Sequence, residues 1–93
     1  MRAARVDANH KAIVEALRRA GCAVLSLAAV GQGVPDLLVY VRGRLWLLEI
    51  KDGEKAPSRR KLTEAQERFR QVWPVELVES VDEALLALGL KSS

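Results

Sequence analysis

Three charged side chains stand at the ends of an otherwise apolar stretch, GVPDLLVYVRGRLWLLEIK, which runs from Gly33 to Lys51. Asp36 precedes the first apolar segment, and Glu49 and Lys51 end the second. Two facing carboxylates repel each other unless they share a divalent cation, and their hard oxygen ligands suit Mg²⁺ or Mn²⁺. A neighbouring lysine can orient an attacking water or offset charge on a phosphate. These residue types are those of a phosphodiester-hydrolysing site. The alternative is a surface Glu–Lys pair beside an unrelated aspartate, which contributes little.

A β-hairpin would bring the three charges together at its open end. A two-residue turn at Arg42-Gly43 places Asp36 directly opposite Glu49, and directly opposed residues share one face of the sheet. Glu49 and Lys51 are two residues apart, so they share that face as well. A bulged turn would shift the pairing by one residue, so the proximity of the carboxylates depends on the length of the turn.

The remaining elements follow from apolar periodicity and capping signals. Helices are predicted from Asp7 as N-cap to about Ala20, from Thr63 to near Trp73, and from Ser80 to Gly89, with strands at 23–27, 36–41, 44–51 and 75–79. Gln66 and Glu83 would complete capping boxes for the last two helices. The order is α-β-β-β-α-β-α, which predicts one mixed α/β domain over residues 1–93. Both faces of the hairpin strands are apolar, so we expect helices on both sides or a partner subunit on one.

Composition agrees with a small globular domain. The chain has 93 residues, with 15 Lys and Arg against 12 Asp and Glu, a net charge of +3. Residues 51–61 hold five basic and two acidic side chains, so this segment accounts for the whole positive excess. It predicts a partner with phosphates, although a solvated charged loop is the alternative. No apolar run approaches a membrane span or a signal peptide. The single cysteine, Cys22, excludes an internal disulfide and a cysteine-rich zinc site and fits a reducing cytoplasm.

Pro35-Asp36, followed after twelve residues by Glu49-Ile50-Lys51, resembles the PD-(D/E)XK nuclease signature. The wider pattern resembles the VRR-NUC family, especially its small stand-alone members in phages and prophages. The matching blocks, which cover nearly the whole chain, are DANHKAIVEAL, GxGxPDLLV, LLEIKDG, PSRRKLTEAQERF and VELVESVDEAL. This resemblance implies a restriction-endonuclease-like core, in which helices flank a mixed four-stranded sheet. It also implies a metal-dependent endonuclease that acts on DNA. For small members it implies a homodimer that cuts branched DNA such as four-way (Holliday) junctions, inside a bacterial host cell.

The resemblance also implies roles for the hairpin residues. Asp36 and Glu49 would bind Mg²⁺ or Mn²⁺ together with the backbone carbonyl of Ile50, and Lys51 would serve the nucleophilic water. These four residues are the predicted catalytic and metal-binding set.

One position departs from the family pattern. Related nucleases often place a Glu or Gln on the first helix, facing the metal. Here His10 lies on the inward stripe of the predicted helix. Its imidazole could hold a ligand or a metal-bound water, or it could be a partly buried histidine that is hydrogen-bonded to its surroundings. Asp7 and Asn9 are alternative occupants of this role.

Contacts with DNA are expected after the hairpin. The predicted phosphate-binding residues are Lys55, Arg59, Arg60 and Lys61, with a solvated charge run as the alternative. Gln66 is predicted to point inward, and the family has a Gln at this position near the site. As part of a capping box, it needs no function.

Two other classes of function remain compatible with the sequence. A DNA-binding module without catalysis would use the same basic loop and keep the charges as a remnant of a nuclease fold. A structural interaction domain would pair through its apolar sheet face. Metal binding that depends on Asp36 and Glu49 separates the nuclease from both alternatives.

Overall fold

The computed structural model of the protein describes residues 8–51 and 62–92. Its elements are α1 (Ala8–Arg19), β1 (Ala23–Ser26), β2 (Leu37–Val41), β3 (Arg44–Ile50), α3 (Glu64–Val72), β4 (Val75–Val78) and α4 (Val81–Ala87). This is the predicted order, and the ends of the elements differ from the prediction by one or two residues. The predicted N-cap Asp7 and residues 52–61, which make up all but the first residue of the basic segment, lie outside the described residues. None of the helices in the described part is long and apolar enough to cross a membrane.

The four strands form one mixed sheet in the order β1-β2-β3-β4. The β1–β2 and β2–β3 pairs are antiparallel, whereas β3 and β4 are parallel. Parallel neighbours need a crossover connection, and here α3 lies between them in the chain. The sheet is therefore the mixed four-stranded sheet that the sequence predicts.

The hairpin between β2 and β3 closes with a two-residue turn, as predicted. Val41 pairs with Arg44, so Arg42 and Gly43 are the two turn residues. Both have positive φ, 53° and 78°, which is the pattern of a type I′ turn and matches the natural twist of the strands. The guanidinium of Arg42 also donates a hydrogen bond of 3.2 Å to the carbonyl of Gly89, after the end of α4. This turn sets the register of the strand ends that carry the charges.

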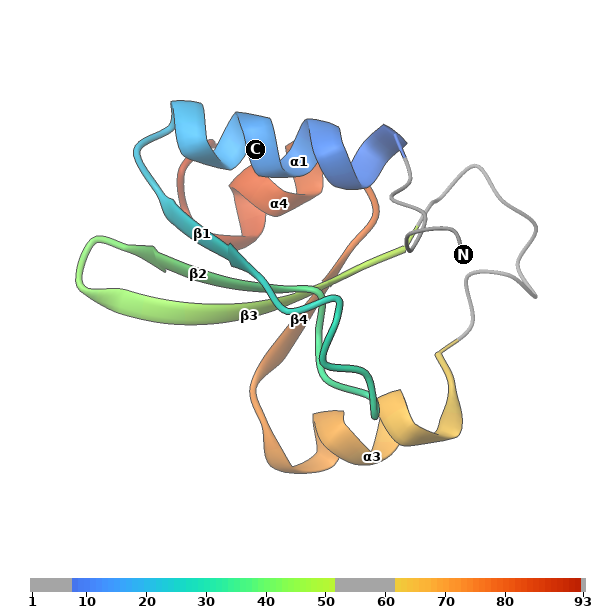
Figure 1. Cartoon of the computed structure of the whole chain (residues 1–93). Helices are drawn as coiled ribbons and strands as arrows, with labels where there is room; N and C mark the ends of the chain where they lie inside the picture. Colours follow the sequence, from blue (N-terminus) through green and yellow to red (C-terminus); the bar gives the residue numbers. More distant parts are fainter. Residues whose placement is uncertain (1–7, 52–61, 93) are drawn as a thin grey trace.

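The helices lie on both sides of the sheet (Figure 1). α1 and α4 cover one face, and α3 lies on the other. The apolar core fills the first of these two interfaces, because alternate residues of each strand point toward α1 and α4. Its fully or almost fully buried members include Ile13, Leu17, Leu37, Val39, Leu48, Val78, Ala84 and Leu88.

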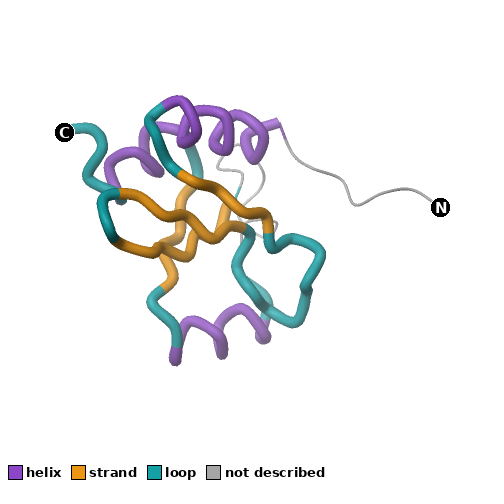
Figure 2. The backbone as a smooth tube through the Cα atoms, turned by 60° about the vertical axis from the view of Figure 1, so that its left-hand side comes forward, coloured by secondary structure: helices purple, strands orange, loops and turns teal. Residues whose placement is uncertain are grey.

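The second face is covered only in part. Figure 2 shows α3 apart from the sheet on the side opposite α1 and α4, next to the loop that leads into β2. No residue of α3 is buried. Leu25, Tyr40 and Leu45 are 58%, 51% and 63% exposed. The register pairs Leu25 with Leu38, and Tyr40 with Leu45, so these side chains share this face. The sequence predicted helices on both faces of the sheet, and the helices cover only one face completely.

The predicted capping boxes have different outcomes. At α3, Thr63 and Gln66 form both reciprocal hydrogen bonds, as predicted. At α4, Ser80 Oγ accepts from the Glu83 N–H at 3.1 Å. The Glu83 carboxylate, however, accepts from the N–H of Glu79 at 2.7 Å instead of that of Ser80. The second box is therefore half formed, because the carboxylate satisfies the amide one residue earlier, directly after β4.

Candidate active site

Asp36 stands immediately before β2 and is held by backbone groups on both sides. Its carboxylate Oδ2 accepts a hydrogen bond of 2.8 Å from the N–H of Ile50 on β3. Its own carbonyl accepts one of 2.7 Å from the N–H of Leu27. At the end of the β2–β3 pair, the Asp36 carboxylate thus accepts the Ile50 N–H in the way that a backbone carbonyl of the neighbouring strand would. As a result, Asp36 is held where the hairpin opens.

The loop before Asp36 turns tightly and packs on α3. Gly31, Gln32 and Gly33 all have positive φ, of 75°, 59° and 82°. A Cβ on Gly33 would lie 2.5 Å from the carbonyl carbon and oxygen of Ala65, so the loop and the first turn of α3 approach at a distance that only glycine allows. The local sequence gives no sign of the contact between this loop and α3. This contact fixes α3 relative to the residue that follows the loop, Asp36.

Glu49 is the buried ionisable residue of the site. It is 4% exposed, and within the described residues no other charged or polar side chain is buried to that extent. The register pairs Leu37 with Leu48, so the next pair along the strands is Asp36 and Glu49, as predicted. Burial and the negative charge of Asp36 raise the pKa of Glu49 to about 8, and the nearby charge of Lys51 acts in the opposite direction. The predicted pair of facing carboxylates is therefore present.

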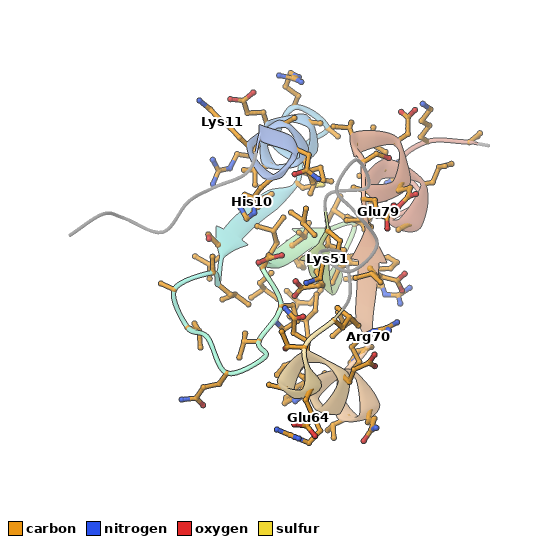
Figure 3. All side chains as sticks on the ribbon, turned by 90° about the vertical axis from the view of Figure 1, so that its right-hand side faces the viewer. His10, Lys11, Lys51, Glu64, Arg70 and Glu79 are labelled. Atoms are coloured by element: carbon orange, nitrogen blue, oxygen red, sulfur yellow. The ribbon has the colours of Figure 1, made fainter. Side chains whose placement is uncertain are left out.

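Lys51 and Gln66 complete a connected group around Glu49. Lys51 Nζ lies 3.8 Å from Glu49 Oε2 and donates a 3.2 Å hydrogen bond to Gln66 Oε1. Gln66 Nε2 donates in turn to Glu49 Oε2 at 3.1 Å. Figure 3 shows Lys51 between α1 and α3. The structure therefore places the predicted lysine beside Glu49 and adds Gln66 to the same group. That Gln66 also contacts DNA remains a prediction.

The first helix contacts the site through the side chain of Asn9. Its Nδ2 donates to the carbonyls of Lys51 and Glu79 at 3.3 and 3.4 Å, and its buried Oδ1 has no hydrogen-bond partner in the described part of the chain. His10 is half-buried on the side of α1 that faces the sheet (Figure 3). Among residues 8–51 and 62–92, it forms no hydrogen bond or ion pair with either carboxylate. Asp7, the third candidate, lies outside the described residues. The contact of Asn9 with the residues that follow β3 and β4 was not predicted, because it joins residues far apart in the sequence.

The predicted phosphate-binding residues Lys55, Arg59, Arg60 and Lys61 also lie outside the described residues. Their roles therefore remain predictions.

The donor set fits a hydrated Mg²⁺ or Mn²⁺. Each carboxylate has one oxygen engaged by the protein, Asp36 Oδ2 by a backbone N–H and Glu49 Oε2 by an amide and an ammonium. The second oxygens, Oδ1 and Oε1, are then the atoms that a cation would share. Mg²⁺ is usually held by one or two carboxylates and keeps several waters. A cation would also act against the burial and the repulsion from Asp36 that together raise the pKa of Glu49.

The fold has a counterpart among solved structures. It is similar to a structure described as a VRR_NUC domain, with a TM-score of 0.53 and 28% sequence identity. The match covers 88% of this chain and 91% of that chain. No protein-family model matches the sequence, and no curated protein matches it. The structural likeness spans nearly all of both chains. This likeness supports a VRR-NUC family domain of nuclease type, and the mixed four-stranded sheet flanked by helices is consistent with a restriction-endonuclease-like fold.

Proposed function

We propose that this domain is a Mg²⁺- or Mn²⁺-dependent endonuclease that hydrolyses phosphodiester bonds in DNA. One observation carries the proposal: Glu49 is 4% exposed and faces Asp36, so two carboxylates share a site that burial alone makes unfavourable. Folded proteins keep such a pair where a cation or a reaction needs it. The pair also matches the two carboxylates of the PD-(D/E)XK signature, and the similar solved structure is described as a VRR_NUC domain.

The proposed ligands are Asp36, Glu49 and the backbone carbonyl of Ile50. A cation held there would make a bound water more acidic and offset charge on the phosphate. Asp36 and Glu49 supply the negative charge that recruits it. Because the Ile50 N–H holds Asp36 at 2.8 Å, the carboxylate is oriented before any cation arrives. We include His10 as a further candidate ligand of the cation. No hydrogen bond or ion pair in the described residues joins it to Asp36 or Glu49.

Lys51 is proposed to serve the attacking water and the phosphate. Its side chain is 15% exposed, and Gln66 and Glu49 hold the ammonium at 3.2 and 3.8 Å. An ammonium in this position can donate a hydrogen bond to the water or to a non-bridging phosphate oxygen. Hydrolysis then forms a bond from the water oxygen to phosphorus and breaks the in-line bond to the leaving oxygen.

The proposed substrate is branched DNA such as a four-way junction. The proposed phosphate contacts come from Lys55, Arg59, Arg60 and Lys61, in the segment that holds the positive excess of the chain. If these residues bind DNA, the affinity must fall steeply with salt. The branched shape of the substrate rests on the resemblance to small VRR-NUC proteins.

A homodimer is proposed because one chain carries one site and one face of the sheet is left apolar. Leu25, Leu38, Tyr40 and Leu45 line an open groove on the face that α3 covers only in part. A two-fold dimer through this groove would bury these side chains and place two sites in one particle.

The dimer is tested by light scattering with Leu45→Lys, which puts a charge into the groove. Val72→Lys is the control, since Val72 is 78% exposed on α3 and lies outside the groove. We expect dimers for the wild type and the control and a monomer for Leu45→Lys. A wild type that is monomeric at the highest measurable concentration would remove the dimer from the proposal.

We also propose that the protein works in the cytoplasm of a bacterial host and is encoded by a phage or prophage. The free, buried thiol of Cys22 fits a reducing compartment. Fractionation of expressing cells tests this, and recovery in an oxidising compartment would contradict it.

Cleavage itself is tested on a panel of single-stranded, duplex, flap and four-way DNA with Mg²⁺ or Mn²⁺. Asp36→Ala, Glu49→Ala and Lys51→Ala should each lower the cleavage rate by about 10³-fold or more while the protein stays folded, because each removes a group that acts on the transition state. Full cleavage activity of folded Glu49→Ala protein would contradict the proposed nuclease function. A DNA-binding module without catalysis would instead show no Mn²⁺ binding that depends on Asp36 and Glu49, which calorimetry measures.

A further inference from the structure

Gln66 connects the first turn of α3 to the charged end of β3. Its Oε1 accepts hydrogen bonds from the backbone N–H of Thr63 at 2.9 Å and from Lys51 Nζ at 3.2 Å. Its Nε2 donates to Glu49 Oε2 at 3.1 Å. One side-chain amide therefore joins a helix N-terminus, an ammonium and a buried carboxylate.

This pattern allows one orientation of the amide. Turning the Gln66 amide by half a rotation would set its NH₂ group against two donors, the Thr63 N–H and the Lys51 ammonium. The same rotation would set its oxygen against the carboxylate of Glu49. Each of the three contacts would become repulsive, and unpaired polar groups in a half-buried position are unfavourable. The capping box thus decides which end of the amide faces Glu49.

The helix that carries the amide is itself held close to the site. Gly33, in the loop before Asp36, packs against Ala65, the residue before Gln66, without room for a Cβ. Thr63 is exposed; its N–H donates to the Gln66 side chain, its hydroxyl accepts from the Gln66 N–H, and its carbonyl accepts from the Glu67 N–H within the helix. An exposed residue outside the site therefore controls a side chain within it.

We propose that Gln66 is a positioning residue of the active site, and that the backbone N–H of Thr63 acts through it. The capping box of α3 holds the amide so that it keeps Glu49 Oε2 and Lys51 Nζ in place together. Glu49 Oε1 is then left to face the cation, and the ammonium stays beside the carboxylate. This inference rests on the proposed function for its use of the cation. Outer groups that orient metal ligands typically change metal affinity by about 10- to 100-fold.

Two substitutions at one exposed position isolate the backbone N–H. Thr63→Ala and Thr63→Pro both remove the hydroxyl that caps the helix, and only proline also removes the N–H that holds Gln66. Thr63 has φ of −72°, which proline adopts without strain. Calorimetry with Mn²⁺, without DNA, should give Thr63→Ala an affinity within about twofold of wild type and Thr63→Pro one about tenfold weaker. Equal affinities for the two variants would overturn the proposal.

A second readout follows the amide directly in the metal-free protein. The side-chain NH₂ of Gln66 should give an NMR signal that exchanges slowly and is displaced from those of Gln32 and Gln71, which are exposed. Thr63→Ala should keep this signal, and Thr63→Pro should bring it to the position of the two exposed glutamines. An unchanged Gln66 signal in the proline variant contradicts the proposal.

If Thr63→Pro does not fold, Gln66→Met takes its place, because it keeps the length of the side chain and removes its hydrogen bonds. It should bind Mn²⁺ about 10- to 100-fold more weakly than wild type with its circular dichroism unchanged. Wild-type affinity in Gln66→Met would overturn the proposal. A wild type that binds no Mn²⁺ would instead contradict the proposed function, whereas the NMR signal of the metal-free protein tests the positioning by itself.

Discussion

The two faces of the sheet differ in what they bury. Toward α1 and α4, the strands bury aliphatic side chains such as Leu37, Val39 and Leu48, each with no exposed surface. Toward α3, they carry Asp36 and the buried Glu49, and no residue of α3 itself is buried. A buried, paired carboxylate opposes folding, so it needs a fold that is stable without it. The closed face supplies this stability, and the open face is left for chemistry.

Neighbouring residues show the difference most sharply. Leu48 and Glu49 are adjacent on β3, and strand alternation sends their side chains to opposite faces. Leu48→Ala should lower the free energy of unfolding by about 2–5 kcal/mol, while the folded fraction keeps its cleavage rate. Glu49→Gln should lower the cleavage rate by about 10³-fold with no loss of stability. Urea unfolding and cleavage of the best DNA substrate measure both. If Leu48→Ala were the catalytically dead variant, the division between the faces would be wrong.

The pH dependence of stability should come from the open face. The pKa of Glu49 rises from 4.5 to about 8 in the folded protein, so the folded state holds this proton more tightly than the unfolded state does. The stability that comes from this tighter binding of the proton is present in full below about pH 4.5 and is lost as the pH rises to 8. The metal-free wild type should therefore lose about 3 kcal/mol between pH 6 and 9, at about 1.4 kcal/mol per unit below the folded pKa.

Glu49→Gln is the control for this pH dependence, because it carries no proton to lose. Its urea midpoint should change less than that of the wild type over the same range. Added Mn²⁺ should stabilise the wild type more at pH 9 than at pH 6, because the cation binds the ionised carboxylate. Identical pH profiles for the two proteins would show that Glu49 does not titrate in this range.

A pair of glycines tests how the loop before Asp36 meets α3. Gly31 and Gly33 both have positive φ, but a Cβ on Gly31 has open space and one on Gly33 meets Ala65. Gly31→Ala should lower the free energy of unfolding by about 1 kcal/mol, from backbone strain alone. Gly33→Ala should lower it by about 1–3 kcal/mol more and reduce cleavage, since the displaced helix carries Gln66. Equal effects of the two substitutions on stability and cleavage would mean that the close approach has no consequence.

The smallest effect on stability and cleavage is expected for Asn9, which links α1 to the residues that follow β3 and β4. Asn9→Ala removes long hydrogen bonds of 3.3 and 3.4 Å to the carbonyls of Lys51 and Glu79, together with an unpartnered buried oxygen. Losing the two hydrogen bonds lowers stability and losing the unpartnered oxygen raises it, so the free energy of unfolding should change by less than about 1 kcal/mol. Cleavage should fall by a few-fold, because the carbonyl of Lys51 loses its partner. A 10³-fold loss in cleavage would instead make Asn9 part of the catalytic group.

Much of this arrangement could be predicted from short-range patterns. The Arg42-Gly43 turn could be identified because a short break with a glycine separates two apolar runs, and a two-residue turn sets the register that opposes Asp36 and Glu49. The Thr63–Gln66 capping box could be identified because its partners are three residues apart. Glu83 was partly mispredicted, since its carboxylate had two amides within reach and sequence spacing does not choose between them.

The sequence by itself determined the elements, the order of the strand charges and the resemblance to the VRR-NUC family, because these depend on alternation, capping and turn residues within a few positions. Only the tertiary structure decided that Gln66 joins Lys51 to Glu49, that Gly33 touches Ala65, and that α3 leaves part of its sheet face open. These contacts join segments that are distant in the chain. Their geometry depends on how α3 returns over the sheet, and no local pattern of residues specifies it.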